Sequence, residues 1–344
     1  MAFTKAKAEQ AALKVSMYGP PGSGKTFTAL LVAEGLARAA GKRVAFVDTE
    51  HGTDFYALPA PRSHHPEAFD FDVLHTRSLT DTLRECQALR TDTHAVVILD
   101  SMTHLWAAAI EAYRGPKTKA GTLPMHAWSN IKRPYKALMT WAINCPMHVF
   151  LLGRQGNEFT EDEETGEVKA AGVKMKAEGE TQYEPHVCLR MESVKPVGKG
   201  SKHATAVPTA FAEKDRSGIL QGRLIEFPNY DSIAKPLLGL LGKSQARFED
   251  EEEVAARDAE AIAKAERERA AASRILLAKF EARLTKAEGL SAVEKIGQEI
   301  AEAKRTLTGA DRQALIDCFR SARDRETDPA EMVERAAQQN AQTN

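Results

Sequence analysis

The first two thirds of the chain alternate short apolar runs with longer amphipathic stretches. The continuous apolar runs at 44–47, 95–99 and 149–152 are typical of strands buried on both faces of a parallel sheet. Strands are predicted at 13–18, 44–50, 94–101, 147–154, 187–192 and 205–213. Helices are predicted at 24–40, 78–90, 102–113 and 128–144, the last interrupted near Pro134. Because strands and helices alternate, the sequence predicts an α/β fold with a mostly parallel central sheet.

The composition changes abruptly at residue 243. Residues 249–272 contain no proline, glycine or aromatic residue, and their acidic residues precede their basic ones, an order that favours a helix. Amphipathic patterns follow, with breaks at Gly289 and Gly309 and N-caps at Ser291 and Thr308, and they predict a small antiparallel helical module. The predicted organisation is a flexible leader at 1–10, an α/β domain at 11–242, a charged connecting helix at 243–272, the helical module at 273–328 and a disordered tail at 329–344.

Composition narrows the class of protein. Of the 344 residues, 43% are hydrophobic and 28% charged, as expected for a soluble globular chain, and the net charge of -1 gives no overall basic signal for nucleic acid. The four cysteines are widely spaced, which argues against a zinc site or a disulfide framework and suits a reducing cytoplasm. No apolar run approaches the roughly 20 residues that a membrane-spanning helix needs, and residues 1–10 lack the apolar stretch of a secretory signal.

Residues 19–26 fit the pattern G-x-x-x-x-G-K-[ST] of a phosphate-binding P-loop. A predicted strand precedes the octamer and a predicted helix follows it, which is the context that this motif requires. Its glycines let backbone N–H groups turn toward phosphate oxygens, and the helix N-terminus adds partial positive charge. Lys25 is predicted to reach the β- and γ-phosphates of a nucleotide, and the Thr26 hydroxyl to bind Mg²⁺. The predicted phosphate site consists of Gly19, Pro20, Pro21, Gly22, Ser23, Gly24, Lys25 and Thr26.

Polar residues follow three of the predicted buried strands, at the sheet edge where ligands bind in open α/β folds. Glu50 is a candidate to orient or deprotonate the water that attacks a γ-phosphate, and the alternative is a solvated loop carboxylate. The apolar run 95–99 ends at Asp100 and Ser101, the Walker B pattern, in which the aspartate holds Mg²⁺ through water. Arg154 ends the next strand and is a candidate γ-phosphate sensor.

Together these segments resemble the RecA family of recombination ATPases, and within it the short RecA-like, AAA-type ATPases of phages that accompany single-strand annealing. The resemblance covers roughly residues 12–230 and implies a RecA-like P-loop ATPase core over the domain at 11–242. It implies that Glu50 is the catalytic base and that Asp54 and Tyr56 contact adenine. Where RecA ends its sensor strand with Asn-Gln, this chain has Gly153, Arg154 and Gln155, so the sensor is charged.

The resemblance also bears on subunits and DNA. It implies that Lys214 and Arg216 reach across a subunit boundary to the neighbour's γ-phosphate, which makes the protein a homo-oligomer with shared ATP sites. The two DNA-binding loops of RecA match the polar segments 114–127 and 155–180, which are expected to be loops. Their cations are expected to follow the phosphates of single-stranded DNA, with plain solvated charge as the alternative. These cations are Arg114, Lys117, Lys119, Lys169, Lys174 and Lys176.

The leading hypothesis is a phage- or prophage-encoded, Mg²⁺-dependent ATPase of the host cytoplasm. It would bind single-stranded DNA in homologous recombination or strand annealing, and DNA would stimulate its hydrolysis of ATP. One alternative is a RecA-fold helicase or loader motor of replication. Another is an ATP-gated switch that binds a protein and no DNA. In either case the helices after residue 243 could contact a single-strand-binding, replication or recombination protein.

Overall fold

The computed structural model describes two units of the chain separately, Met1–Phe248 and Glu249–Asn344. Within them it describes residue 5 and residues 12–62, 64–114, 123, 127–161, 168–194, 206–242, 251–303 and 305–327. The predicted leader, apart from residue 5, the predicted tail and most of the segment 114–127 lie outside these residues. No helix in the described ranges is long and apolar enough to cross a membrane.

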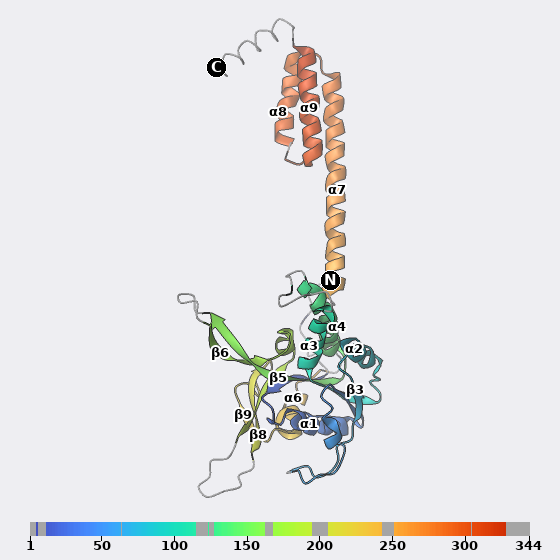
Figure 1. The fold of residues 1–344 in the computed structure, drawn as a ribbon. Coiled ribbons are helices and arrows are strands. Elements are labelled where there is room, and N and C mark those ends of the chain that lie inside the picture. Colours follow the sequence, from blue (N-terminus) through green and yellow to red (C-terminus); the bar gives the residue numbers. More distant parts are fainter. Residues whose placement is uncertain are drawn as a thin grey trace. The chain divides into compact units, whose positions relative to one another are not determined.

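The first unit is built on one sheet, which has nine strands in the described residues (Figure 1). Its order is β3-β2-β4-β5-β1-β7-β8-β9, and β6 pairs with β5 off this path. The first six strands of that order run parallel, and β6, β8 and β9 are antiparallel to their neighbours. The predicted mostly parallel α/β fold is therefore confirmed. The strands are β1 Lys14–Gly19, β2 Arg43–Asp48, β3 Asp72–His75, β4 His94–Asp100, β5 His148–Glu161, β6 Val168–Met175, β7 Val187–Val194, β8 Val207–Asp215 and β9 Leu224–Glu226.

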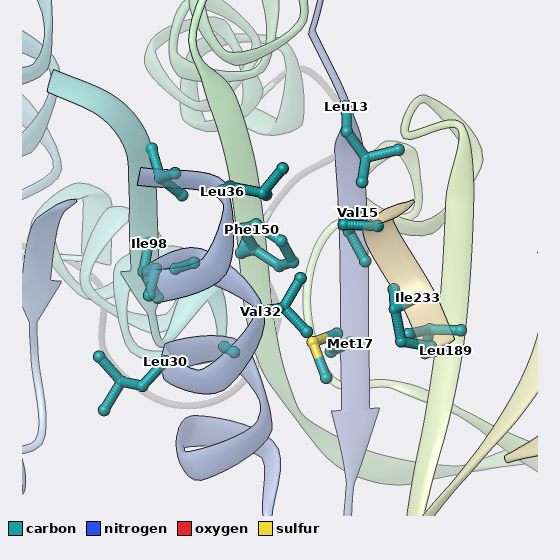
Figure 2. Packing of buried hydrophobic residues seen from close by; sticks show 14 of the residues in the cluster. Leu13, Val15, Met17, Leu30, Val32, Leu36, Ile98, Phe150, Leu189 and Ile233 are labelled. Atoms are coloured by element: carbon teal, nitrogen blue, oxygen red, sulfur yellow. The ribbon is translucent and has the colours of Figure 1, made fainter. Parts of the chain in front are cut away.

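Helices cover both faces of this sheet. In β4, Val96 and Ile98 pack with α1 on one face, whereas Val97 and Leu99 pack with α2, α3 and α4 on the other. The same alternation runs through β2 and β5, which explains why these strands are continuously apolar. Figure 2 shows the first face, where Val32 and Leu36 of α1 lie over the strands. The helical segments of this unit are α1 Lys25–Ala40, η1 Thr53–Phe55, α2 Leu79–Ala88, α3 Met102–Arg114, α4 Ala127–Asn144, α5 Glu180–Tyr183, η2 Tyr230–Ala234 and α6 Lys235–Leu238.

Two local expectations are wrong. Most of the described part of segment 155–180 is strand rather than loop, since β5 continues to Glu161 and pairs with β6 to form an antiparallel hairpin (Figure 1). Its strands are polar because most of their described side chains are exposed. Helix α4 is not interrupted at Pro134. A proline removes one backbone hydrogen bond, but buried contacts on both sides, at Ile131 and Tyr135 among others, keep the helix in one piece.

The second unit contains three helices in its described residues, α7 Glu251–Lys286, α8 Leu290–Ala303 and α9 Gly309–Glu326. Their shared core includes Phe280, Val293 and Leu315. Helix α7 is continuous through residue 272, where the sequence pattern placed the end of the connecting helix. Thr308 caps α9 by accepting a hydrogen bond from the Asp311 N–H, as predicted. The helices break at Gly289 and just before Gly309, as predicted, but Ser291 is not a cap, because α8 starts one residue before it.

Candidate nucleotide-binding site

The predicted P-loop connects β1 to α1 with the backbone that the motif requires. Gly22 and Gly24 have φ values of 73° and 88°, in the left-handed region that side chains disfavour. A Cβ on Gly19 would lie 2.2 Å from the Met191 carbonyl oxygen. Glycine is therefore needed at all three positions. The turn delivers the chain to the N-terminus of α1 at Lys25, where free N–H groups can bind an anion.

Lys25 folds back over this loop. Its ammonium donates to the carbonyls of Gly19 and Pro20 at 3.0 Å each and lies 3.4 Å from the Ser23 hydroxyl. Burial lowers the pKa of Lys25, while the charges of Asp100 and Glu50 raise it. These contacts all belong to the loop itself, so the ammonium sits where it could exchange them for phosphate oxygens.

Thr26 and Asp100 meet from α1 and the end of β4. The threonine hydroxyl donates to Asp100 Oδ2 at 2.6 Å. Burial raises the pKa of Asp100 to about 6, and the charge of Glu50 adds to the rise. A hydroxyl and a buried carboxylate are the donor set with which P-loop proteins hold Mg²⁺, so the residues present fit this ion.

Asp48, which ends β2, organises the turn that carries Glu50. Its carboxylate accepts hydrogen bonds from the backbone N–H groups of Glu50, His51 and Thr53, and from the Thr53 hydroxyl. Burial alone would raise the pKa of Asp48, but these hydrogen bonds outweigh it and lower the pKa. Asp48 is therefore occupied in fixing the backbone, whereas Glu50 keeps a side chain that is 38% exposed.

Glu50 lies among side chains from β5, from the turn after β4 and from α3. Its Oε1 accepts from Arg154 Nε at 3.1 Å and Nη2 at 3.0 Å, and from the Ser101 hydroxyl at 3.2 Å. His104 of α3 stands 3.9 Å away through its Nδ1. That nitrogen also lies 2.9 Å from the Thr49 hydroxyl, and burial lowers the pKa of the imidazole. Sequence reasoning missed His104, although its place in the helical turn that follows β4 was a signal.

An aromatic pocket of about 430 Å³ lies beside the P-loop. Phe27, the residue after Thr26, stacks with Tyr56 at 6.4 Å between ring centroids and meets the edge of Phe227 at 6.2 Å. Pro208 closes against the loop, since a Cβ on Gly24 would lie 2.8 Å from its ring. The pocket could hold a nucleobase next to the phosphates. Its lining residues are Phe27, Tyr56, Pro61, Arg62, His64, Ala206, Val207, Pro208 and Phe227.

Of the two residues expected at the base, Tyr56 lines this pocket and Asp54 is not among its lining residues. Asp54 is exposed in η1. The sequence analysis missed Phe27 and Phe227. The first had a usable signal, because it directly follows the P-loop, whereas Phe227 reaches the pocket only through the fold.

Lys214 and Arg216 lie at the sheet edge opposite to the P-loop. Arg216 N–H donates to the His186 carbonyl, and His186 N–H donates to the Lys14 carbonyl, so Arg216 is level with the start of β1. Gly19, at the other end of β1, is five residues away, about 16 Å along a strand. Both side chains donate to the Tyr183 carbonyl, Arg216 at 3.1 Å. They do not reach the P-loop of their own chain.

The hairpin cations share one face of β5 and β6. Lys174 lies opposite Gly156 and Lys169 opposite Thr160, and residues directly opposite each other in an antiparallel pair point to the same side. The register shift between Glu158 and Phe159 keeps Lys169 on this face despite the odd spacing. Lys176 joins it by alternation, and its N–H donates to the Arg154 carbonyl at 2.7 Å.

The remaining predicted cations lie elsewhere. Arg114 ends α3 and is 4.0 Å from Glu111. Lys117 and Lys119 lie outside the described residues. Lys174 pairs with Glu158 at 3.7 Å, with both side chains about half exposed.

A P-loop between a parallel strand and a helix, with carboxylates from neighbouring strand ends, defines the class of P-loop nucleotide-binding proteins. A family model described as an AAA domain matches residues 11–217. The chain belongs to this family of P-loop ATPases, and the matched residues form an ATPase domain. Among curated proteins no match to the chain was found.

Proposed function

We propose that this protein is a RecA-like, ATP-dependent single-stranded-DNA-binding protein of homologous recombination or strand annealing. The nucleotide would be MgATP. The P-loop N–H groups and Lys25 would hold its phosphates, and Thr26 and Asp100 its Mg²⁺. The ion would neutralise phosphate charge. The aromatic pocket beside Phe27 would take the base.

Glu50 would act as the general base. Its carboxylate is held by Ser101 and Arg154 at the C-terminal edge of the sheet, where it can accept a proton from an attacking water. Arg154 would compensate the negative charge that develops on the γ-phosphate. Because Arg154 pairs with Glu50, the Arg154 side chain contacts the proposed general base and also lies where the terminal phosphate would bind.

The observation that carries the DNA-binding proposal is the hairpin. Its lysine face starts at Arg154, which is itself bonded to Glu50. Lys169, Lys174 and Lys176 there could follow the phosphates of a single strand. Arg114, Lys117 and Lys119 would contribute a second contact with the strand. A γ-phosphate that moves Arg154 would thus move the root of the DNA-binding face, which is a physical route for ATP to control DNA affinity.

The position of Lys214 and Arg216 supports the proposed assembly into homo-oligomers. Cations about 16 Å from the P-loop along the sheet can complete an ATP site only in another copy. Two different surfaces would then meet, the P-loop edge of one copy and the opposite edge of the next. Such a heterologous contact produces rings or filaments rather than two-fold dimers.

The test is the ATPase rate of the full chain with and without single-stranded DNA, measured over a range of salt concentrations, with particle images of the same samples. We expect DNA to raise the rate, salt to weaken this effect, and ATP to promote ring or filament formation. Lys25→Ala is the control and should lose nucleotide binding. ATP hydrolysis without any response to DNA would leave an ATP-gated protein switch, for which the second unit, with a hydrophobic core of its own, would be the partner-binding module. Separation of a forked duplex would instead indicate a helicase.

A further inference from the structure

The loop after η1 folds over the N-terminal turn of α1 and forms one wall of the aromatic pocket. Its two arms pair through Phe69 N–H to the Tyr56 carbonyl at 2.9 Å and Ala60 N–H to the Pro66 carbonyl at 3.0 Å. His65 stacks on Phe69 and lies 3.2 Å from Glu34 of α1. These contacts attach the loop to the helix that begins at the P-loop.

Arg62 holds the inside of this loop together. Its Nη1 donates to the Phe55 carbonyl at 2.8 Å, and its Nη2 donates to the carbonyls of Leu58 and Glu67 at 2.8 Å each. Its Nε donates to the His65 carbonyl at 3.3 Å. Four contacts therefore occupy four of the five N–H donors of a guanidinium.

The same side chain also lines the pocket. Its guanidinium carbon lies 5.8 Å from the ring centroid of Tyr56 and 5.8 Å from that of Phe69. Phe69 in turn contacts Tyr56 and Phe27 edge-on. With its donors turned to backbone carbonyls, Arg62 offers the pocket mainly its flat face.

We infer that Arg62 is a positioning residue for the nucleobase: it fixes the loop so that Tyr56 and Phe27 form a stacking site, and it does not itself read the base. The inference rests on the proposed nucleotide site. On this inference the pocket recognises its nucleobase by stacking, which fits a purine nucleotide. An arginine is needed at position 62 because it can donate to several loop carbonyls at once.

Binding of ATP, GTP and inorganic tripolyphosphate to the full chain separates this role from the others. Arg62→Ala should weaken ATP and GTP by the same factor, about 5- to 100-fold, the range of one lost base-stacking contact. Tripolyphosphate should bind as in the wild type, because the P-loop is untouched. Arg62→Lys should not restore affinity, since one ammonium cannot span four carbonyls. Phe27→Ala should give the same pattern from the other wall.

Arg84→Ala is the matched control, because Arg84 is an exposed arginine of α2 whose ion pairs are with Asp81 and Glu85. A change in the ATP-to-GTP ratio of more than about tenfold in Arg62→Ala would overturn the inference in favour of direct reading of the base, because the loss of a hydrogen bond to one of the two bases would have this effect. Equal loss of tripolyphosphate binding, or unchanged ATP binding, would also overturn it. If the wild type binds ATP and GTP no more tightly than tripolyphosphate, the base pocket is excluded. If it binds neither nucleotides nor tripolyphosphate, the proposed nucleotide site itself is excluded.

Discussion

Arg154 donates to a single carboxylate oxygen of Glu50 from both Nε and Nη2, at 3.1 and 3.0 Å. The two residues are 104 positions apart; Arg154 lies within β5, and Glu50 lies in the turn that follows β2. Neither side chain is deeply buried, with 52% of Arg154 and 38% of Glu50 exposed. An exposed ion pair of this kind stabilises the fold little. Its main effect is therefore on the charge and the hydrogen bonding of the Glu50 carboxylate. While the pair holds, the charge of Glu50 is compensated and its oxygen is engaged.

Replacement of either partner should affect turnover rather than ATP binding. In Glu50→Gln the amide oxygen can still accept from Arg154 and Ser101 but cannot accept a proton, so kcat should fall about 10²- to 10⁴-fold. The Kd for ATP should change only slightly. Arg154→Ala should also lower kcat. Because the two side chains contact each other, the double variant should lose less than the product of the two single effects.

Single-turnover hydrolysis and equilibrium ATP binding check this prediction. Glu67→Gln, an exposed glutamate of the same region of sequence, should behave as the wild type. Normal hydrolysis in Glu50→Gln would remove Glu50 as the base, and strictly multiplicative losses would mean that the pair has no role in turnover.

Mixing two inactive variants tests whether ATP sites are shared. Arg216→Ala leaves the P-loop side of each copy intact, and Glu50→Gln leaves the opposite edge intact. If Lys214 and Arg216 act on a neighbour, mixed assemblies will contain some sites with an intact base and intact cations, and activity should partly return. The rate should be measured across mixing ratios. Absence of rescue at every ratio would favour an ATP site built within one subunit.

The lysine face of the hairpin should contribute to DNA affinity through phosphate contacts. Substitution of Lys169, Lys174 and Lys176 by alanine should reduce the slope of log Kd against log salt by about 2, since each phosphate contact on a single strand contributes roughly 0.7. ATP hydrolysis without DNA should remain. Lys235→Ala is a suitable control, because this exposed lysine pairs with Asp231 near α6. An unchanged salt slope in the triple variant would place DNA elsewhere or exclude it.

The sequence predicts best those elements that follow from local rules. Gly24 and Gly41 mark the two ends of α1 by their left-handed backbone, and the runs in β2, β4 and β5 are apolar because both of their faces are buried. Strands β3 and β9 are short and partly exposed, so no apolar run reveals them. The hairpin was missed although its strands are long. They extend beyond the part of the sheet that helices cover, and their exposed polar residues resemble those of a loop.

For the candidate site, the sequence locates single groups but not their partners. The edge rule for parallel strands brings Glu50, Asp100 and Arg154 to one place, yet it does not say that Arg154 would pair with Glu50. The role of Asp48 depends on four hydrogen-bond donors that are aligned only in the folded turn. Arg62 is still less predictable, because its partners are backbone carbonyls, whose directions no residue pattern encodes.

The stability of the first unit should depend on two histidines at the start of β1. His148 Nδ1 accepts from the Leu13 N–H at 2.9 Å, and His186 Nδ1 accepts from the Lys14 N–H at 3.2 Å. Burial, with the charge of Lys14, lowers the pKa of His148 to about 4. Burial also lowers the pKa of His186 to about 4, helped by Arg216, Lys14 and Lys214 and opposed by Asp215. Lys14 itself is buried and donates to the carbonyls of Cys145 and Met147.

The sign of the effect follows from these directions. In the unfolded chain a histidine has a pKa of about 6.5, so between about pH 6.5 and 4 the unfolded state binds more protons than the folded one. These two histidines should therefore lower the free energy of unfolding as the pH drops through this window, by up to roughly 3 kcal/mol each. Asp100 opposes this loss, because its pKa is raised to about 6 in the folded state. Protonation would also remove both acceptors from β1. Above about pH 6.5 these two groups should add no pH dependence.

Urea unfolding at a series of pH values measures this loss. Glutamine at both positions keeps an acceptor that does not titrate, so the variant with His148→Gln and His186→Gln should lose much less stability than the wild type between about pH 6.5 and 4. His51→Gln, at an exposed histidine, should keep the wild-type profile. If the double variant loses stability with acid as steeply as the wild type, other groups dominate. The proximity of both imidazoles to Lys14 would then have no bearing on how the sheet responds to pH.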